Sequence, residues 1–150
     1  MLEEHPMVKQ VFYPGLESHP DFHMADKIFR SGRDDDAEED EVKQTYGGMI
    51  SFVTIGEGED ALRRARNVCE RLKVINLAVS LGGVESLVEH PASMTHTMIP
   101  REVRLQGGLP DGLIRLSVGL ERAKDLVEDL KNALDLCDKD GCDVEGEYEP

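Results

Sequence analysis

Short apolar runs of strand length alternate along this chain with segments whose apolar residues recur at helical spacing. The clearest strand pattern covers 113–119, where Ile114, Leu116 and Val118 share one face, and Arg115 and Ser117 share the other. The clearest helical pattern covers 121–136, with leucines and valine along one stripe. Because each element must bury its apolar side against another, this alternation predicts a layered domain of mixed α and β structure.

The same patterns predict further strands at 8–13, 49–55 and 74–79, and further helices at 18–31, 59–73 and 100–105. Residues 85–89 are expected to form one helical turn before His90-Pro91. Four strands and several amphipathic helices fit an α+β fold with α/β-type alternation. We therefore expect a small four-stranded, mostly antiparallel sheet with its helices mainly on one face.

The negative charge of the chain is concentrated in two segments. The 150 residues include 31 acids and 17 bases, for a net charge of −14. Seven acids lie between Asp34 and Glu41, and the tail from Asp135 carries seven more against one lysine. We predict one domain over 1–136 with a solvated acidic loop at 33–43, followed by a disordered acidic tail at 137–150.

Several function classes are disfavoured by composition. An acidic chain offers no electrostatic attraction to nucleic acid or to anionic lipid, and no apolar run approaches the length of about 20 residues that crosses a bilayer. The N-terminus lacks the basic and apolar regions of a signal peptide, so a cytoplasmic location is expected. His19 and His23 lie four apart, but no third ligand is evident nearby, so no metal site is expected.

The residues most suggestive of chemistry are Ser80, the glycines that follow it, and Arg115. Gly82 and Gly83 allow backbone to approach a ligand closely, because neither carries a Cβ atom. Arg115 stands within an otherwise apolar strand, where its guanidinium needs a partner. That partner is either the carboxylate of a ligand, which the planar fork suits, or one of the many acids of the chain in a structural ion pair. Residue chemistry alone favours neither.

Two segments resemble a known family. Residues 76–96 read NLAVSLGGVESLVEHPASMTH, and residues 111–121 read DGLIRLSVGLE. Both are similar to signatures in the C-terminal small domain of the Cys/Met-metabolism family of PLP-dependent enzymes, which have fold type I. That family includes cystathionine γ-synthase, cystathionine γ-lyase and methionine γ-lyase. Residues 13–20 and 47–52 match earlier parts of the same domain in order, so the resemblance runs from about Leu2 to Leu136.

The resemblance implies roles for particular residues. Arg115 would grip the α-carboxylate of a sulfur-containing amino acid, and Ser80 would assist through its backbone and side chain. Val79 would influence substrate choice, with Leu81, Gly82 and Gly83 as the supporting loop. Val79 resembles methionine γ-lyases, whereas Gly83 departs from their usual acidic residue. The subfamily therefore stays open.

The cofactor requires a part that this sequence lacks. PLP chemistry needs a Schiff-base lysine, which the family carries in its large N-terminal domain. None of the seven lysines here has the expected flanking residues. The resemblance thus implies no catalytic residue in this chain and no covalently held PLP. A PLP domain or a family enzyme chain would complete the site, in an oligomer. Two alternatives are a non-catalytic interaction or regulatory module, and a truncated product without activity.

Overall fold

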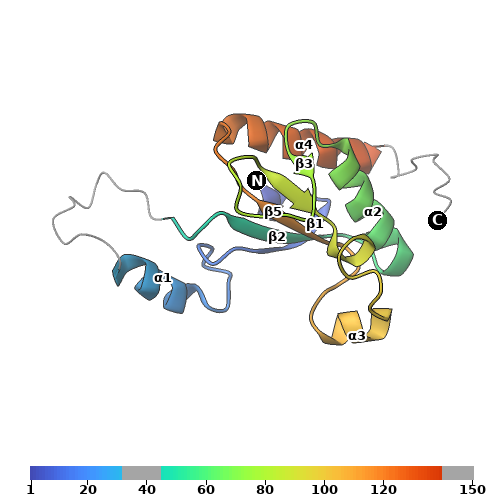
Figure 1. Ribbon diagram of the computed structural model, residues 1–150, viewed down its shortest axis with the longest axis horizontal. Helices are drawn as coiled ribbons and strands as arrows, with labels where there is room; N and C mark the ends of the chain where they lie inside the picture. The colour runs from blue at the N-terminus through green and yellow to red at the C-terminus, as the bar shows by residue number, and fades with distance from the viewer. Residues whose placement is uncertain (32–44, 140–150) are drawn as a thin grey trace.

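A five-stranded sheet forms the centre of the molecule, seen in a computed structural model that describes residues 1–31 and 45–139 (Figure 1). The strands are β1 (Val8–Phe12), β2 (Met49–Thr54), β3 (Asn76–Leu77), β4 (Leu87–Glu89) and β5 (Leu113–Ser117). Their spatial order is β1-β2-β5-β4-β3. Only the β3–β4 pair is parallel, and the other three pairs are antiparallel. The α+β class and the mostly antiparallel sheet are therefore confirmed.

The helices are α1 (Phe22–Ser31), α2 (Gly58–Arg71), α3 (Arg101–Gln106) and α4 (Ala123–Lys139), with short 3₁₀ turns η1 (Leu2–Glu4) and η2 (Pro91–Ser93). The two long helices, α2 and α4, lie together over the sheet, whereas α1 and α3 lie towards opposite ends of the molecule (Figure 1). Among the described residues, no helix is long and apolar enough to span a membrane.

The core lies between the sheet and the two long helices. Phe52 of β2 is opposite Ile114 of β5, and both are fully buried. Leu130 and Leu134 of α4 belong to the same cluster of buried side chains. This confirms the expected alternation in 113–119, because Ile114 and Leu116 are buried in the core while Arg115 lies on the opposite face.

The N-terminal segment is joined to the last helix by a hydrogen bond. The His5 Nε2 atom lies 3.1 Å from an oxygen of Asp135 in α4. Its Nδ1 atom accepts the backbone N–H of Met7 at 3.2 Å, so the proton belongs on Nε2 and is donated to Asp135. The chain start is thereby held against the last helix.

The fifth strand, β4, corrects the predicted helical turn at 85–89 and the predicted count of four strands. β4 pairs with β5 on one side and β3 on the other, and Leu87, Val88 and Glu89 are all buried. Three residues are too few to show a two-residue period, and a glutamate within the strand further obscures it. Pairing with both neighbours determines the strand here, and sequence periodicity does not reveal it.

β3 is shorter than the predicted strand at 74–79. The preceding residues turn away from the sheet to meet α4, where the Asp129 carboxylate accepts the backbone N–H groups of Lys73, Val74 and Ile75 at 2.9–3.2 Å. These N–H groups are therefore satisfied by a side chain rather than by a neighbouring strand.

Two predicted boundaries also shift. The first helix begins at Phe22 and not at 18, because the Ser18 hydroxyl donates to Glu3 and so does not cap the helix. α4 continues to Lys139, and Cys137 is buried within it, so the predicted boundary between 136 and 137 falls inside a helix. The acidic loop at 33–43 and the tail from 140 onwards lie outside the described residues.

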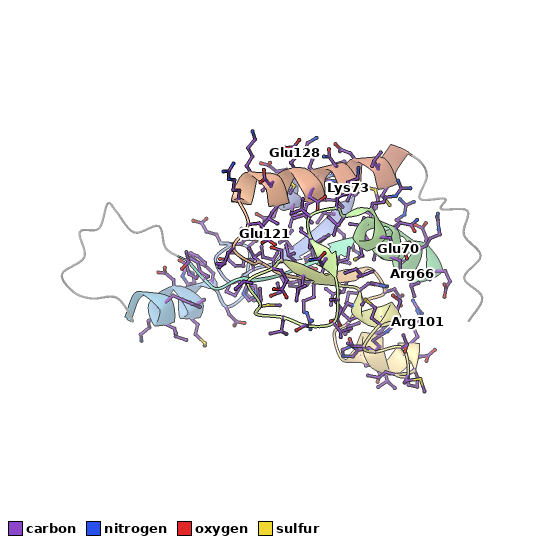
Figure 2. The ribbon with its side chains drawn as sticks, turned by 45° about the horizontal axis from the view of Figure 1, so that its top comes forward. Arg66, Glu70, Lys73, Arg101, Glu121 and Glu128 are labelled. Atoms are coloured by element: carbon purple, nitrogen blue, oxygen red, sulfur yellow. The ribbon has the colours of Figure 1, made fainter. Side chains whose placement is uncertain are left out.

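Three arginines of α2 are paired with acids on the same helix. Arg63 and Arg64 contact Asp60 at 2.9 and 2.8 Å, and the Arg66 guanidinium lies 3.7 Å from Glu70. Figure 2 shows Arg66 and Glu70 side by side on the outer part of the helix. These i,i+3 and i,i+4 pairs neutralise the basic residues locally.

Candidate functional site

The loop between β3 and β4 is fastened to the C-terminal end of β5. The Gly82 N–H donates to the Ser117 hydroxyl at 2.8 Å, and Gly82 has a φ of +74°, which favours glycine. Further along, Ser86 donates from both its backbone N–H and its hydroxyl to Glu121, each at 2.7 Å. These two hydrogen bonds lower the pKa of Glu121, which therefore stays ionised and keeps accepting.

Gly119 allows the loop to pack directly on the strand end. A Cβ atom at this position would lie 2.4 Å from the Val84 carbonyl oxygen and 2.6 Å from the Ser86 nitrogen. The Gly119 N–H also donates to the Ser86 hydroxyl at 2.8 Å. Gly119, in segment 111–121, therefore allows the loop around Ser86, in segment 76–96, to pack against the end of β5.

This arrangement brings the predicted site residues together. The Arg115 Nη2 atom donates to the carbonyl oxygens of Val79 and Ser80, at 3.1 and 3.3 Å. The Arg115 side chain is 26% exposed, and Ser80, Leu81, Gly82 and Gly83 are all exposed on the adjoining loop. Val79 turns its carbonyl to the arginine while the residue as a whole is 55% exposed. A guanidinium thus lies beside an accessible loop.

Sequence reasoning missed Glu89. This residue is opposite Arg115 in the β4–β5 register, and its Oε2 atom lies 2.6 Å from Arg115 Nη2. The Glu89 side chain is only 1% exposed, and its Oε1 atom accepts the Thr95 hydroxyl. The structural ion pair considered for Arg115 is therefore present. An available signal was the acid at 89 within a buried apolar run, which had been assigned to a helical turn.

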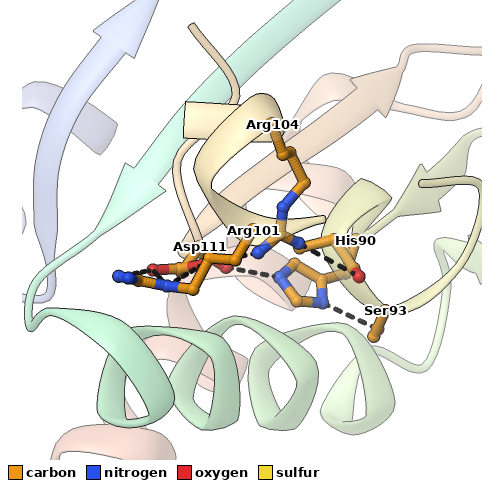
Figure 3. A network of polar contacts seen from close by, with 6 residues as sticks. His90, Ser93, Arg101, Arg104 and Asp111 are labelled. Atoms are coloured by element: carbon orange, nitrogen blue, oxygen red, sulfur yellow. Dashed lines mark hydrogen bonds and ion pairs between the residues drawn. The ribbon is translucent and has the colours of Figure 1, made fainter. Parts of the chain in front are cut away.

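A second polar network lies where α3 and the start of β5 meet η2 (Figure 3). Asp111 is buried and receives hydrogen bonds from Arg101 at 2.6 Å and from Arg104, also at 2.6 Å. Arg104 is buried as well and donates to the Ala92 carbonyl at 3.2 Å. Two guanidinium groups on one buried carboxylate fix α3 relative to β5.

His90 belongs to this network as a neutral side chain. Its Nε2 atom lies 2.7 Å from the Asp111 carbonyl oxygen, which can only accept, so Nε2 carries the proton. Its Nδ1 atom, 2.7 Å from the Ser93 hydroxyl, is then the acceptor. Burial lowers the pKa of His90. Both ring nitrogens are engaged, so the geometry favours a structural role over the general-base role that a lone histidine also allows.

Comparison with known proteins identifies the family. The family model described as Cys/Met metabolism PLP-dependent enzyme matches residues 1–135. The chain belongs to this family. A cystathionine β-lyase of Coxiella burnetii is 47% identical over 133 residues, and a cystathionine γ-lyase of Dictyostelium discoideum is 42% identical over 136 residues. These alignments cover 89% and 91% of this chain but only 30% of each relative.

Solved structures agree with the family assignment. Cystathionine γ-synthase from Xanthomonas oryzae pv. oryzae, in complex with aminoacrylate and cysteine, superposes with a TM-score of 0.71 and 38% sequence identity. The match covers 92% of this chain and 31% of that one. The chain thus spans about a third of the length of these Cys/Met-metabolism enzymes.

The cofactor of the Cys/Met-metabolism family is PLP, and the described residues do not fit a covalent PLP site. The five lysines whose side chains the structure describes are all exposed: Lys9, Lys27, Lys73, Lys124 and Lys131. Lys131 is paired with Asp135 at 2.8 Å. None of the five makes a hydrogen bond or ion pair with Arg115, Glu89 or Ser80. In the described part of the chain, no group of three or more histidines, cysteines or acids is placed to hold a metal ion.

Proposed function

We propose that this chain is the C-terminal small domain of a PLP-dependent C–S lyase or γ-synthase of sulfur amino-acid metabolism, and that it supplies the clamp for the substrate α-carboxylate. The observation that carries this proposal is the partly exposed Arg115 guanidinium, held beside the accessible Ser80 loop on the face of the sheet opposite the core. A planar guanidinium recognises a carboxylate through paired N–H donors. Ser80 offers a further hydroxyl on this exposed loop.

The site requires a second component. Because the five lysines with described side chains are exposed and make no hydrogen bond or ion pair at Arg115, we assign the Schiff-base lysine and the rest of the PLP site to another chain or to a further segment, within an oligomer. When bound there, PLP would supply the electron sink for cleavage next to sulfur. The role of this chain is to bind the substrate carboxylate and orient it. On its own the chain is expected to be inactive.

Val79 is the residue proposed to influence the choice of substrate. Its side chain lies at the accessible edge of the site, while its carbonyl oxygen accepts from Arg115. A substitution there can change the surroundings of the amino-acid side chain and still keep the carbonyl that contacts the arginine. This placement separates specificity from carboxylate binding.

The proposal is tested by complementation. The full chain is mixed with the lysine-bearing remainder of the Coxiella burnetii cystathionine β-lyase, and thiol release from L-cystathionine is measured. Activity is expected only when both parts are present, and Arg115→Lys is expected to raise KM because it removes the paired donors. Arg63→Lys, on α2, is the matched control and should leave KM unchanged. Full activity after Arg115→Lys would refute the clamp.

A second measurement tests the cofactor assignment separately. The chain alone is incubated with PLP, reduced with borohydride and examined by absorbance and peptide mass spectrometry. No stoichiometric adduct is expected. An adduct on one specific lysine would show that this chain itself holds the cofactor and would overturn the division of the site between two parts.

A further inference from the structure

The carboxylate of Glu89 is buried beneath the proposed clamp. Only 1% of the side chain is exposed, and the Thr95 hydroxyl donates to Oε1. Oε2 lies 2.6 Å from Arg115 Nη2 but makes no aligned hydrogen bond within the described residues. A buried carboxylate is retained only when a charge compensates it, and Arg115 is the compensating cation in contact with it.

The guanidinium is held at one nitrogen. Nη2 meets three oxygens, those of Glu89, Val79 and Ser80, which lie on two different segments. Nε and Nη1 have no hydrogen-bond partner among residues 1–31 and 45–139. A long, flexible side chain is thus fixed through one terminal nitrogen, and the donors at Nε and Nη1 stay available.

We propose that Glu89 is a positioning residue, which holds Nη2 of Arg115 and thereby fixes the plane of the guanidinium, so that a remaining donor at Nε or Nη1 is presented to an incoming carboxylate. This inference rests on the proposed clamp function of Arg115. Ordering the side chain before binding removes part of the entropic cost of immobilising it in the complex. Glu89 does not touch the ligand in this arrangement, and it acts through the arginine.

Two effects of Glu89 oppose each other, which makes the inference testable. Its negative charge weakens the attraction of Arg115 for a second carboxylate, whereas its contact with Nη2 orders the guanidinium. Removing the charge would tighten binding if the first effect dominated, and would weaken it if the second did. Positioning requires the second outcome.

The experiment uses the full chain labelled with ¹⁵N and compares it with Glu89→Gln, which keeps the shape of the side chain. The first readout is the order parameter of the Arg115 Nε–H group. We expect it to fall in the variant to the flexible range, below about 0.6. The second readout is the shift of the same signal on titration with L-methionine, with L-methioninamide as the control that lacks the carboxylate. Affinity should weaken about tenfold, within the range for residues in direct contact.

Two further variants make the result specific. Asp60→Asn removes a carboxylate that pairs with two arginines on α2, far along the chain from the clamp, and should leave the Arg115 signal unchanged. Thr95→Val removes the hydroxyl that donates to Glu89 and keeps the volume, so it should loosen Arg115 partially even if Glu89→Gln fails to fold.

The outcomes separate this inference from the proposed function. An unchanged order parameter in Glu89→Gln, or tighter binding of L-methionine, would overturn the positioning role. If L-methionine does not shift the Arg115 signal in the unaltered chain, the complementation assay with Arg115→Lys decides the clamp function, and the order parameter still decides whether Glu89 positions the arginine. A fall in the order parameter together with weaker binding supports both.

Discussion

Substitution of Arg115 by alanine should damage the fold as well as any ligand site. It leaves the Glu89 carboxylate buried without its cation, and breaking a buried ion pair in this way costs about 3–5 kcal/mol. Arg115 is 26% exposed, and solvent can reach part of the vacated space, so we expect the lower end, about 3 kcal/mol. For a chain of this size that corresponds to a fall in Tm of about 9 °C.

The double variant separates the stability effect from the functional one. Glu89→Gln in the Arg115→Ala background removes the stranded charge, so we expect it to restore about 2 kcal/mol. Urea denaturation of the unaltered chain, both single variants and the double variant completes the cycle. Strictly additive costs across the cycle would show that the two side chains are not coupled and would refute the reasoning.

Four further substitutions have expected outcomes. Asp129→Ala removes the acceptor of three backbone N–H groups and should cost about 2–3 kcal/mol in urea denaturation. Gly119→Ala places a Cβ atom 2.4 Å from the Val84 carbonyl and should cost about 2–3 kcal/mol, measured in the same way. Gly82→Ala meets open space at positive φ and should cost only about 1 kcal/mol. The lowered pKa of His90 means that the unfolded chain binds its proton first as pH falls, so stability should decline below the usual value of 6.5, and His90→Gln should flatten that decline in Tm against pH.

Each of these predictions would be contradicted by a specific outcome. Asp129→Asn serves as the matched control because it retains one acceptor oxygen, and equal losses for Asn and Ala would count against the role of the carboxylate. Equal costs for Gly82→Ala and Gly119→Ala would show that close packing on the strand end is unimportant. A Tm profile that is the same with and without His90 would mean that its protonation does not oppose folding.

The fold was predictable where periodicity is strong. The strand at 113–119 and the long helices show their buried faces in the sequence, because each extends over several periods. β4 was missed because three residues carry no period and its identity depends on β3 and β5 on either side. The start of α1 was misplaced because Ser18 has a capping side chain that bonds instead to Glu3, a contact that no local rule contains.

The sequence predicts which residues belong to the candidate site, but it does not predict which of them contact one another. Ser80 and Arg115 stand out as a serine before two glycines and a cation in an apolar strand. Their contact depends on how the loop after β3 folds over β5, which Ser117, Gly119 and Glu121 determine. Glu89 could not be predicted as the partner of Arg115, because the register between two strands cannot be obtained from the sequence of one strand alone.

The contact between His5 and Asp135 also has a consequence for how the protein is made. The two residues are 130 positions apart, and α4 supplies several of the side chains that cover the sheet. At ribosomal rates of about 5–20 residues per second, the first strand therefore emerges on the order of ten seconds before its covering helix. During that interval the apolar face of the nascent sheet is exposed to neighbouring chains. Protection by chaperones should matter most for this protein while it is still being translated.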